Sequence, residues 1–198
     1  MKINTIILLS FLFSLGAYAQ DPHVELGLKG GLNVASLTLS NSNKFDPRIS
    51  FHVGGLAHIH LTEKVAIQPE ITFSAQGAKQ TVRDTVYHSN FNYINIPILF
   101  QYMIGKGFRL ETGPQLGLLL SAKSKTKYNE NDIKGSFKSY DFSWAFGAGY
   151  LMDSGLGFDA RYNLGLSNIS SGTHGKFTNR VFQLGVFYQF KKVGHEGK

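Results

Sequence analysis

Apolar side chains alternate with polar or very small ones along eight segments of this chain, each about ten residues long. In the segment over 23–37, Val24 and Leu26 fall on one parity, and Glu25 and Lys29 fall on the other. Successive side chains of a β-strand point to opposite faces, so each segment would have one apolar face and one polar face. The pattern predicts an all-β fold: an eight-stranded antiparallel up-and-down transmembrane β-barrel, preceded by a cleaved signal peptide.

The predicted strands are joined alternately by short and long connections. The strands cover 23–37, 50–61, 65–76, 92–102, 108–121, 140–150, 156–167 and 180–190. The short turns cover 62–64, 103–107 and 151–155, and the longer connections lie near 38–49, 77–91, 122–139 and 168–179. Short turns on one rim and long loops on the other distinguish the periplasmic end of such barrels from the extracellular end. We therefore expect both termini in the periplasm.

Apart from Arg180, the first residue of the last segment, the apolar parity of these strands carries no charged residue. A lysine or arginine facing lipid at mid-bilayer costs on the order of 2–4 kcal/mol, so this absence favours lipid contact. Tyr102, Tyr150 and Tyr188 fall at strand ends, where an aromatic girdle is expected. Pro69 and Pro114 share the apolar parity and predict local bulges in the sheet.

Residues 1–19 have the features of a signal peptide. Lys2 precedes an apolar stretch over 6–15, and Ala17-Tyr18-Ala19 reads as a cleavage site between small residues. The stretch is too short for a transmembrane helix, which needs about 20 apolar residues. The sequence therefore predicts two parts, the signal peptide over 1–19 and one barrel domain over 20–198.

Composition excludes several classes of site. The chain has no cysteine, which rules out disulfides, thiolate metal sites and acylation of a lipoprotein. The net charge is +7, but the basic residues are dispersed over loops and strands and line no single helix or groove. We therefore expect no nucleic-acid partner and no cofactor.

Charged residues of the polar parity define the first candidate site. They are Arg109, Glu111, Asp159, Arg161 and Glu70. The segment over 140–150 offers small residues on the same parity, which would leave room for these side chains to meet. Side chains nearly fill an eight-stranded barrel, and buried charges persist only when paired. We predict a packed ionic network in the lumen and no open pore.

Four segments carry a resemblance to a known family. They are YINIPILFQY (93–102), GPQLGLLLSAK (113–123), DFSWAFGAGY (141–150) and ARYNLGLSNI (160–169). Together they resemble the PorT-like outer-membrane β-barrel family of Gram-negative bacteria, over nearly all of the mature chain. The resemblance implies an eight-stranded outer-membrane barrel. Most members have no known role, and the name-giving member is tied to a system that secretes proteins across that membrane.

Histidines supply a second candidate site. His52, His58 and His60 share the lumen-facing parity with Glu70 and Ser74, on two strands joined by a three-residue turn. A metal site and a hydrolytic Ser-His-Glu group are the chemical alternatives. Hairpin pairing places the His52/Ser74 pair and the His58/Glu70 pair at different positions along the strands. A catalytic nucleophile, its base and the orienting carboxylate must instead lie together at one place. A lumen hydrogen-bond network is therefore the expectation, with no catalytic residue and no metal.

Lysines gather in the connection over 122–139. They are Lys123, Lys125, Lys127, Lys134 and Lys138, against Glu130 and Asp132. Beside a leaflet rich in lipopolysaccharide phosphate, these ammonium groups would neutralise anions. The alternative is a solvated loop whose charge serves solubility.

The leading hypothesis is a non-enzymatic integral outer-membrane protein with a structural or interaction role, as an accessory to protein secretion or envelope maintenance. Its expected partners are outer-membrane lipids, lipopolysaccharide, the barrel assembly machinery during folding, and secretion or envelope proteins. A lipid-modifying outer-membrane enzyme and a small-solute channel remain as alternatives. A soluble lipocalin-like barrel would require the opposite parity, with the charged side chains outside.

Overall fold

The computed structural model describes residues 24–39, 45–82, 85–172 and 175–190. The predicted signal peptide over 1–19 lies outside the described residues. Long antiparallel strands make up most of the described chain: β1 (Val24–Leu39), β2 (Asp46–His60), β3 (Val65–Val82), β4 (Thr85–Ile104), β5 (Phe108–Lys125), β7 (Tyr140–Leu151), β8 (Leu156–Gly165) and β9 (Phe177–Gln189). A short strand β6 (Glu130–Asp132) and a 3₁₀ turn η2 (Lys134–Ser136) lie between β5 and β7. Within the described residues, no helix is long and apolar enough to cross a membrane.

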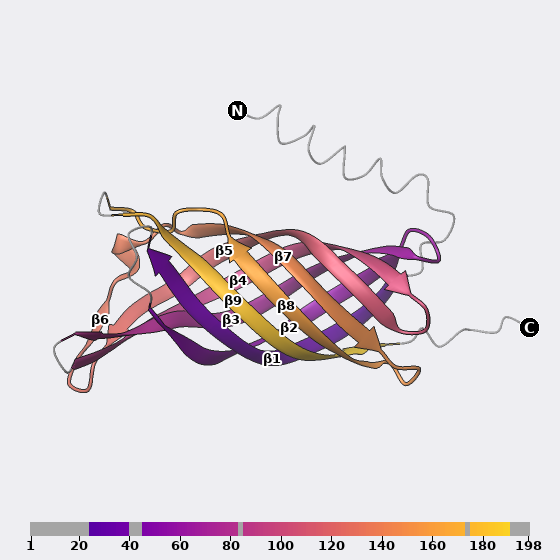
Figure 1. The fold of residues 1–198 in the computed structure, drawn as a ribbon, viewed down its shortest axis with the longest axis horizontal. Coiled ribbons are helices and arrows are strands. Elements are labelled where there is room, and N and C mark those ends of the chain that lie inside the picture. The colour runs from indigo at the N-terminus through magenta and orange to yellow at the C-terminus, as the bar shows by residue number, and fades with distance from the viewer. Residues whose placement is uncertain (1–23, 40–44, 83–84, 173–174, 191–198) are drawn as a thin grey trace, which may run out of the picture.

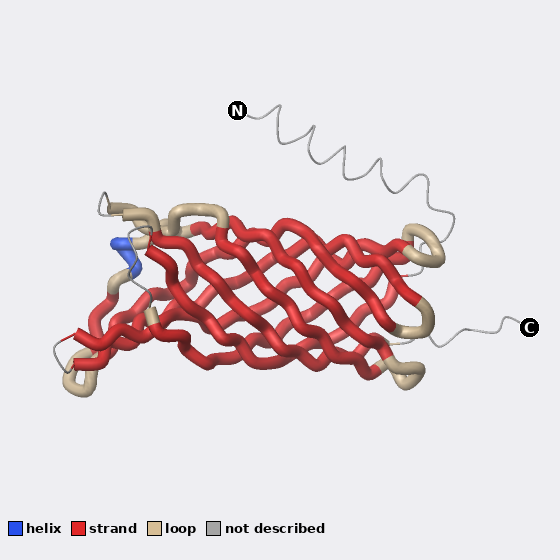
Figure 2. Tube along the Cα trace, in the orientation of Figure 1, coloured by secondary structure: helices blue, strands red, loops and turns tan. Residues whose placement is uncertain are grey.

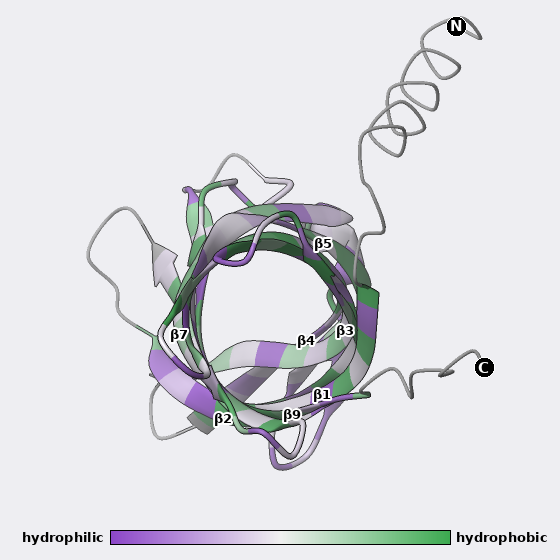
Figure 3. Cartoon of the chain, turned by 90° about the vertical axis from the view of Figure 1, so that its right-hand side faces the viewer, coloured by the Kyte–Doolittle hydropathy of each residue, from purple (hydrophilic) through white to green (hydrophobic). Residues whose placement is uncertain are grey.

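The long strands form a closed ring (Figures 1 and 3). Each pairs antiparallel with its neighbours, and β9 returns to pair with β1, with Gly31 opposite Gly185. The short strand β6 pairs with β5 and stays outside the ring. Closure leaves no free sheet edge in the ring, so its backbone hydrogen bonds are satisfied within the sheet. The predicted eight-stranded antiparallel barrel is confirmed in the described part of the chain.

The two rims of the barrel differ as the sequence suggested. Tight turns follow β2, β4 and β7, and they lie together on the right of Figure 2, opposite η2. The start of β1 lies at the same rim, since Val24 pairs with Ile59 just before the turn after β2, and the end of β9 lies beside it, since Gly27 pairs with Gln189. Both ends of the described barrel therefore share the rim of the short turns.

The expected long connection over 77–91 is wrong. Strands β3 and β4 continue through it, with their ladder paired from Gly77 opposite Asn90 to Val82 opposite Thr85. Gly77 has a φ of +141°, and a Cβ there would collide with the carbonyl oxygen of Ser89, so this position requires glycine. The resulting hairpin projects past the rest of the barrel on the left of Figure 1. The connection expected over 122–139 is likewise partly strand, because β5 extends to Lys125 and β6 folds back on it.

The bulges expected at Pro69 and Pro114 are also wrong. Pro69 stays in register opposite Ile98, and Pro114 opposite Trp144. A proline removes one ladder hydrogen bond, but it does not force an extra residue into the strand. The register shifts occur elsewhere, between Pro47 and His52 and at Asn92/Tyr93.

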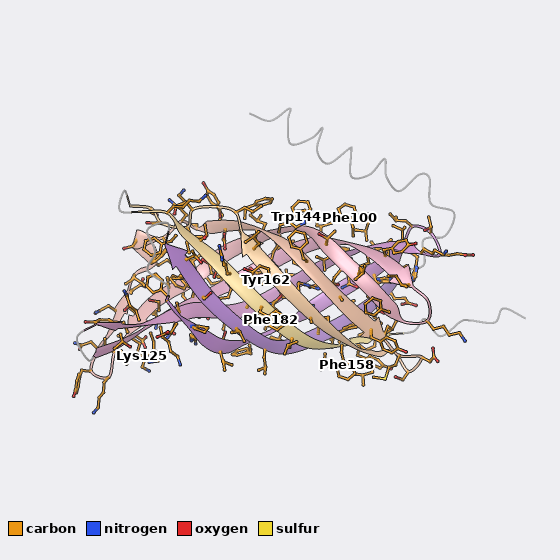
Figure 4. All side chains as sticks on the ribbon, viewed as in Figure 1. Phe100, Lys125, Trp144, Phe158, Tyr162 and Phe182 are labelled. Atoms are coloured by element: carbon orange, nitrogen blue, oxygen red, sulfur yellow. The ribbon has the colours of Figure 1, made fainter. Side chains whose placement is uncertain are left out.

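The predicted parity matches the two surfaces of the barrel. Apolar side chains such as Leu116, Leu118 and Leu120 are exposed on the outside. In Figure 4, the labelled aromatic residues Phe100 and Trp144 project from the outer surface. Polar residues of the other parity are buried inside the ring. The outside is therefore suited to lipid, and charged side chains such as Lys29, Glu70 and Arg161 lie in the interior.

Candidate functional site

Arg161 of β8 lies at the centre of the charged interior and is 2% exposed. Its Nε donates a hydrogen bond to Glu111 Oε1 on β5 at 2.8 Å. Its Nη1 and Nη2 donate to Glu70 Oε2 and Oε1 on β3 at 3.0 and 2.9 Å. This bidentate geometry suits the planar guanidinium group. One cation therefore bridges two carboxylates from strands that are not neighbours in the sheet.

Lys29 of β1 extends this set of contacts. Its Nζ lies 3.1 Å from Asp159 Oδ2 and 3.4 Å from Glu70 Oε2, and its side chain is 1% exposed. Lys29, Glu70, Glu111, Asp159 and Arg161 thus form one connected group, which we call the lumen network. Sequence reasoning did not include Lys29 among the candidate site residues, although its polar parity in the first strand was the available signal.

Arg109 is placed differently from what the sequence suggested. Among the described residues, no carboxylate oxygen lies within ion-pair distance of its guanidinium, which instead donates to Gln101 at 3.4 Å and to Gln189 at 3.5 Å. The guanidinium also lies 5.3 Å from the ring centre of Phe187, in a cation–π contact. Gln101 links it indirectly to the lumen network, because the Gln101 amide donates to Glu111 Oε2 at 2.9 Å.

Glycines make room for the lumen network. A Cβ at Gly147 of β7 would lie 2.7 Å from Glu111 Oε1. A Cβ at Gly185 of β9 would lie 2.7 Å from Asp159 Oδ1. Real side chains essentially never approach so closely, so a larger residue at either position would displace a carboxylate. Gly147 of β7 and Gly185 of β9 therefore have a packing role next to the charged groups.

The histidines take part in hydrogen bonding within the barrel. His52 Nδ1 lies 2.8 Å from Asn33 Oδ1, and the Asn33 amide donates to Ser74 Oγ at 3.0 Å. Asn33 therefore connects the side chains of His52 and Ser74, which also lie opposite each other in the β2–β3 ladder. The rings of His58 and His60 meet edge to face, 4.5 Å apart. In the described part of the chain, no group of three or more His, Asp or Glu residues is arranged to hold a metal ion.

An apolar cluster fills the interior at the long-loop rim. Its buried members come from around the ring: Leu37, Ala78, Phe91, Tyr93, Leu119, Ala122 and Ile169. Ile133 and Phe137, from the segment after β5, pack against it, and the Phe91 and Phe137 rings are 4.8 Å apart. Backbone hydrogen bonds fix this segment, from Ile133 N to Ala122 O at 3.0 Å and from Lys138 N to Ile169 O at 2.8 Å. We call residues 130–138 the cap, because they cover this end of the barrel.

The five lysines of the predicted loop do not form one set. Lys123 is ion-paired with Glu130 at 2.6 Å, and this hydrogen bond holds the pKa of the Glu130 carboxyl below its ordinary value. Lys125 and Lys127 line a groove together with Arg48 and His88. Lys134 and Lys138 belong to the cap. Sequence reasoning missed Arg48 and His88, since it placed both in long connections with no fixed geometry.

Comparison with known proteins agrees with this architecture. Residues 18–171 match the family described as "Outer membrane protein beta-barrel domain". The fold is similar to Ail, the attachment invasion locus protein of Yersinia pestis, with 14% identity and a TM-score of 0.50, over 84% of this chain and 98% of that one. It is also similar to Neisserial surface protein A, with 14% identity and a TM-score of 0.55, over 83% of this chain and 97% of that one.

At these identities the two structures bear on the fold alone, and no curated protein matches the sequence. The family match covers well over half of the chain, and its description agrees with a closed ring that is apolar outside and charged inside. The chain therefore belongs to the outer membrane protein beta-barrel domain family, and it is a transmembrane β-barrel of the Gram-negative outer membrane.

Proposed function

We propose that this protein is a non-enzymatic outer-membrane barrel that works through interactions at its long-loop rim, and that its lumen does not conduct solutes. One observation carries the proposal: the interior is filled at two levels, by the lumen network and by the apolar cluster beneath the cap. Buried paired charges and packed aromatic rings leave little room for a continuous water path. The projecting hairpins and the cap then offer the structured surface that is free to meet a partner.

The orientation is part of the same proposal. The short-turn rim and both termini face the periplasm, residues 1–19 are removed after export, and the β3–β4 hairpin faces the medium. This arrangement follows the usual asymmetry of outer-membrane barrels. The four segments similar to the PorT-like family support a role in secretion or envelope maintenance. The proposed partners are therefore outer-membrane lipids, lipopolysaccharide, the barrel assembly machinery, and secretion or envelope proteins.

A lipid-modifying enzyme fits the geometry less well. The Ser74 hydroxyl is buried inside the barrel and accepts hydrogen bonds from Asn33 and Gln76, at 3.0 Å each. A lipid ester in the membrane could reach this group only by crossing the wall of the barrel. A catalytic group for lipid chemistry is expected at the outer surface or the rim.

Crosslinking in living cells tests the interaction role. The tagged protein is compared with a variant in which residues 80–87 are replaced by Asn-Gly, a turn that joins the paired residues Lys79 and His88. We expect the wild type to crosslink to secretion or envelope proteins and the shortened variant to lose those products while still folding. Crosslinks that are the same for both proteins would contradict a role for the projecting hairpin.

A further inference from the structure

A groove of about 800 Å³ lies where the first residues of β2 and β4 and the last residue of β5 meet the turn after β5. It is lined by Arg48, Val86, His88, Asn90, Lys125, Thr126, Lys127 and Tyr128, and we call it the basic groove. The lining contains three fixed positive charges and no carboxylate. Lys125 marks its place in Figure 4, on the projecting part of the barrel. The charge of the lining favours an anionic ligand.

The basic groove is built on hydrogen-bonded backbone, and the Arg48 side chain is itself bonded to that backbone. Arg48 Nη1 donates to the carbonyl oxygen of Gln76 at 2.7 Å, beside the register shift between β2 and β3. His88 lies directly opposite Lys125 in the β4–β5 ladder. Thr126 closes the following turn, because its N–H donates to Asn129 O at 2.8 Å. These contacts preorganise the groove, which lowers the entropy lost when a ligand binds.

The neighbouring acids are engaged outside the basic groove. Glu130 accepts a hydrogen bond from Lys123 at 2.6 Å, and Asp132 accepts one from the backbone N–H of Lys134 at 2.8 Å. Both acids therefore make these hydrogen bonds to groups that do not line the groove, while Glu130 also lies opposite Lys125 in the β5–β6 ladder. Lys127 lies over the ring of Tyr128, 5.6 Å from its centre, and Tyr128 is 82% exposed. The groove thus combines three cations, of which only Lys125 lies opposite an acid, Glu130, with an exposed aromatic side chain, which suits a charged sugar.

The groove lies beyond the lipid-facing surface of the same strands, toward the projecting β3–β4 hairpin. His88 and Asn90 share the parity of Ile94, which is half-buried, and of Ile96, which is exposed on the outside of the barrel. Six residues of strand separate His88 from Ile94, which corresponds to about 20 Å along the strand. A group bound against His88 and Asn90 would therefore lie on the outer side of the barrel wall, beyond the apolar surface and close to the lipid head groups.

We propose that the basic groove binds the phosphorylated saccharide of outer-leaflet lipopolysaccharide, with Arg48, Lys125 and Lys127 on the phosphoryl oxygens and Tyr128 against a sugar ring. The proposal rests on the proposed orientation, with the β3–β4 hairpin at the cell surface. The proposal is more specific than a general attraction between a lysine-rich loop and anions. It assigns phosphate binding to two of the five loop lysines and adds an arginine from β2.

Binding of lipopolysaccharide to the purified full-length barrel in detergent tests the proposal. The double variant Lys125→Gln/Lys127→Gln should bind at least about tenfold more weakly than the wild type, the loss expected for two charge-assisted contacts. The matched variant Lys134→Gln/Lys138→Gln removes the same charge from the cap and should stay within about twofold of the wild type. Equal weakening in the two variants would overturn the proposal.

Two further probes identify the ligand. Enzymatically dephosphorylated lipopolysaccharide should bind the wild type as weakly as the intact lipid binds the groove variant, whereas unchanged binding would contradict phosphate recognition. Inorganic phosphate should compete only at concentrations far above that of the lipid. Competition at equal concentration would indicate a site for free anions and would refute the lipid assignment.

A labelling experiment separates failure of this proposal from failure of the orientation. The chain lacks cysteine, so Asn129→Cys introduces a single thiol beside the groove, and Ser154→Cys introduces one in a short turn. A membrane-impermeant maleimide should label only the first variant on intact cells. The reverse labelling would show that the orientation is wrong, while correct labelling with unchanged binding by the groove variant would refute the lipid site alone.

Discussion

Replacing Arg161 with methionine is expected to destabilise the barrel strongly. The substitution removes the three hydrogen bonds of 2.8, 2.9 and 3.0 Å that join β8 to Glu111 and Glu70. Breaking a buried ion pair typically costs about 3–5 kcal/mol, because a charge is left without compensation. Here Lys29 stays 3.4 Å from Glu70 and Gln101 stays bonded to Glu111, so both carboxylates keep a partner. We therefore expect a loss near the lower bound, about 3 kcal/mol.

Urea unfolding in lipid vesicles, followed by the fluorescence of Trp144, measures this loss. With a denaturant slope of about 1–3 kcal/mol per molar urea, the midpoint should fall by at least about 1 M. The same substitution at the exposed Arg180 is the control and should change the stability by no more than about 0.5 kcal/mol. Equal midpoints for the two variants would refute the reasoning, since they would show that the bridge from Arg161 to two acids does not stabilise the fold.

The remaining predictions concern the packing around the lumen network and the lipid-facing surface. Gly147→Val should lower the unfolding midpoint, because a Cβ there would lie 2.7 Å from Glu111 Oε1 and 2.8 Å from the carbonyl oxygen of Ala160. Gly135→Val should leave the midpoint unchanged, because a Cβ there meets nothing within 4 Å. Similar midpoints for the two variants would contradict the packing role. Leu116→Arg should reduce the folded yield, measured by heat-modifiable migration, because an arginine at mid-bilayer costs about 2–4 kcal/mol. Asn129→Arg adds the same charge in an exposed turn and should fold normally; equal yields would show that Leu116 does not face lipid.

The alternation of side chains was sufficient to predict the barrel because lipid imposes it on every strand. On the lipid-facing side a polar side chain would be unfavourable. The apolar parity is therefore evident from the sequence, as at Leu116, Leu118 and Leu120. The pattern gave no such information over 77–91, where the β3–β4 hairpin extends past the apolar surface. Ala78 and Phe91 still pack in the apolar cluster, but nearer the tip both faces of the strands are exposed, as at Gln80, Thr81, Val86 and Tyr87. There the backbone ladder continues without a hydrophobic signature.

The candidate residues were easier to predict than their partners. Arg161 and Glu70 are 91 residues apart, and their strands are separated in the ring by β9, β1 and β2. Pairing across a lumen depends on strand tilt and stagger, which hairpin register alone does not reveal. For the same reason Lys29 was missed, and Arg109 was expected to pair with an acid. The packing of Phe137 against Phe91 depends on how the cap folds back, which the sequence pattern does not encode.

Planar-bilayer recording of the purified wild-type protein tests the central claim most directly. The lumen network and the apolar cluster beneath the cap should together block ion flow, so we expect no stable unitary current steps at any moderate voltage. The protein must first be shown by heat-modifiable migration to be folded in the same preparation. Reproducible single-channel steps from that folded protein would contradict the closed lumen and favour a small-solute channel.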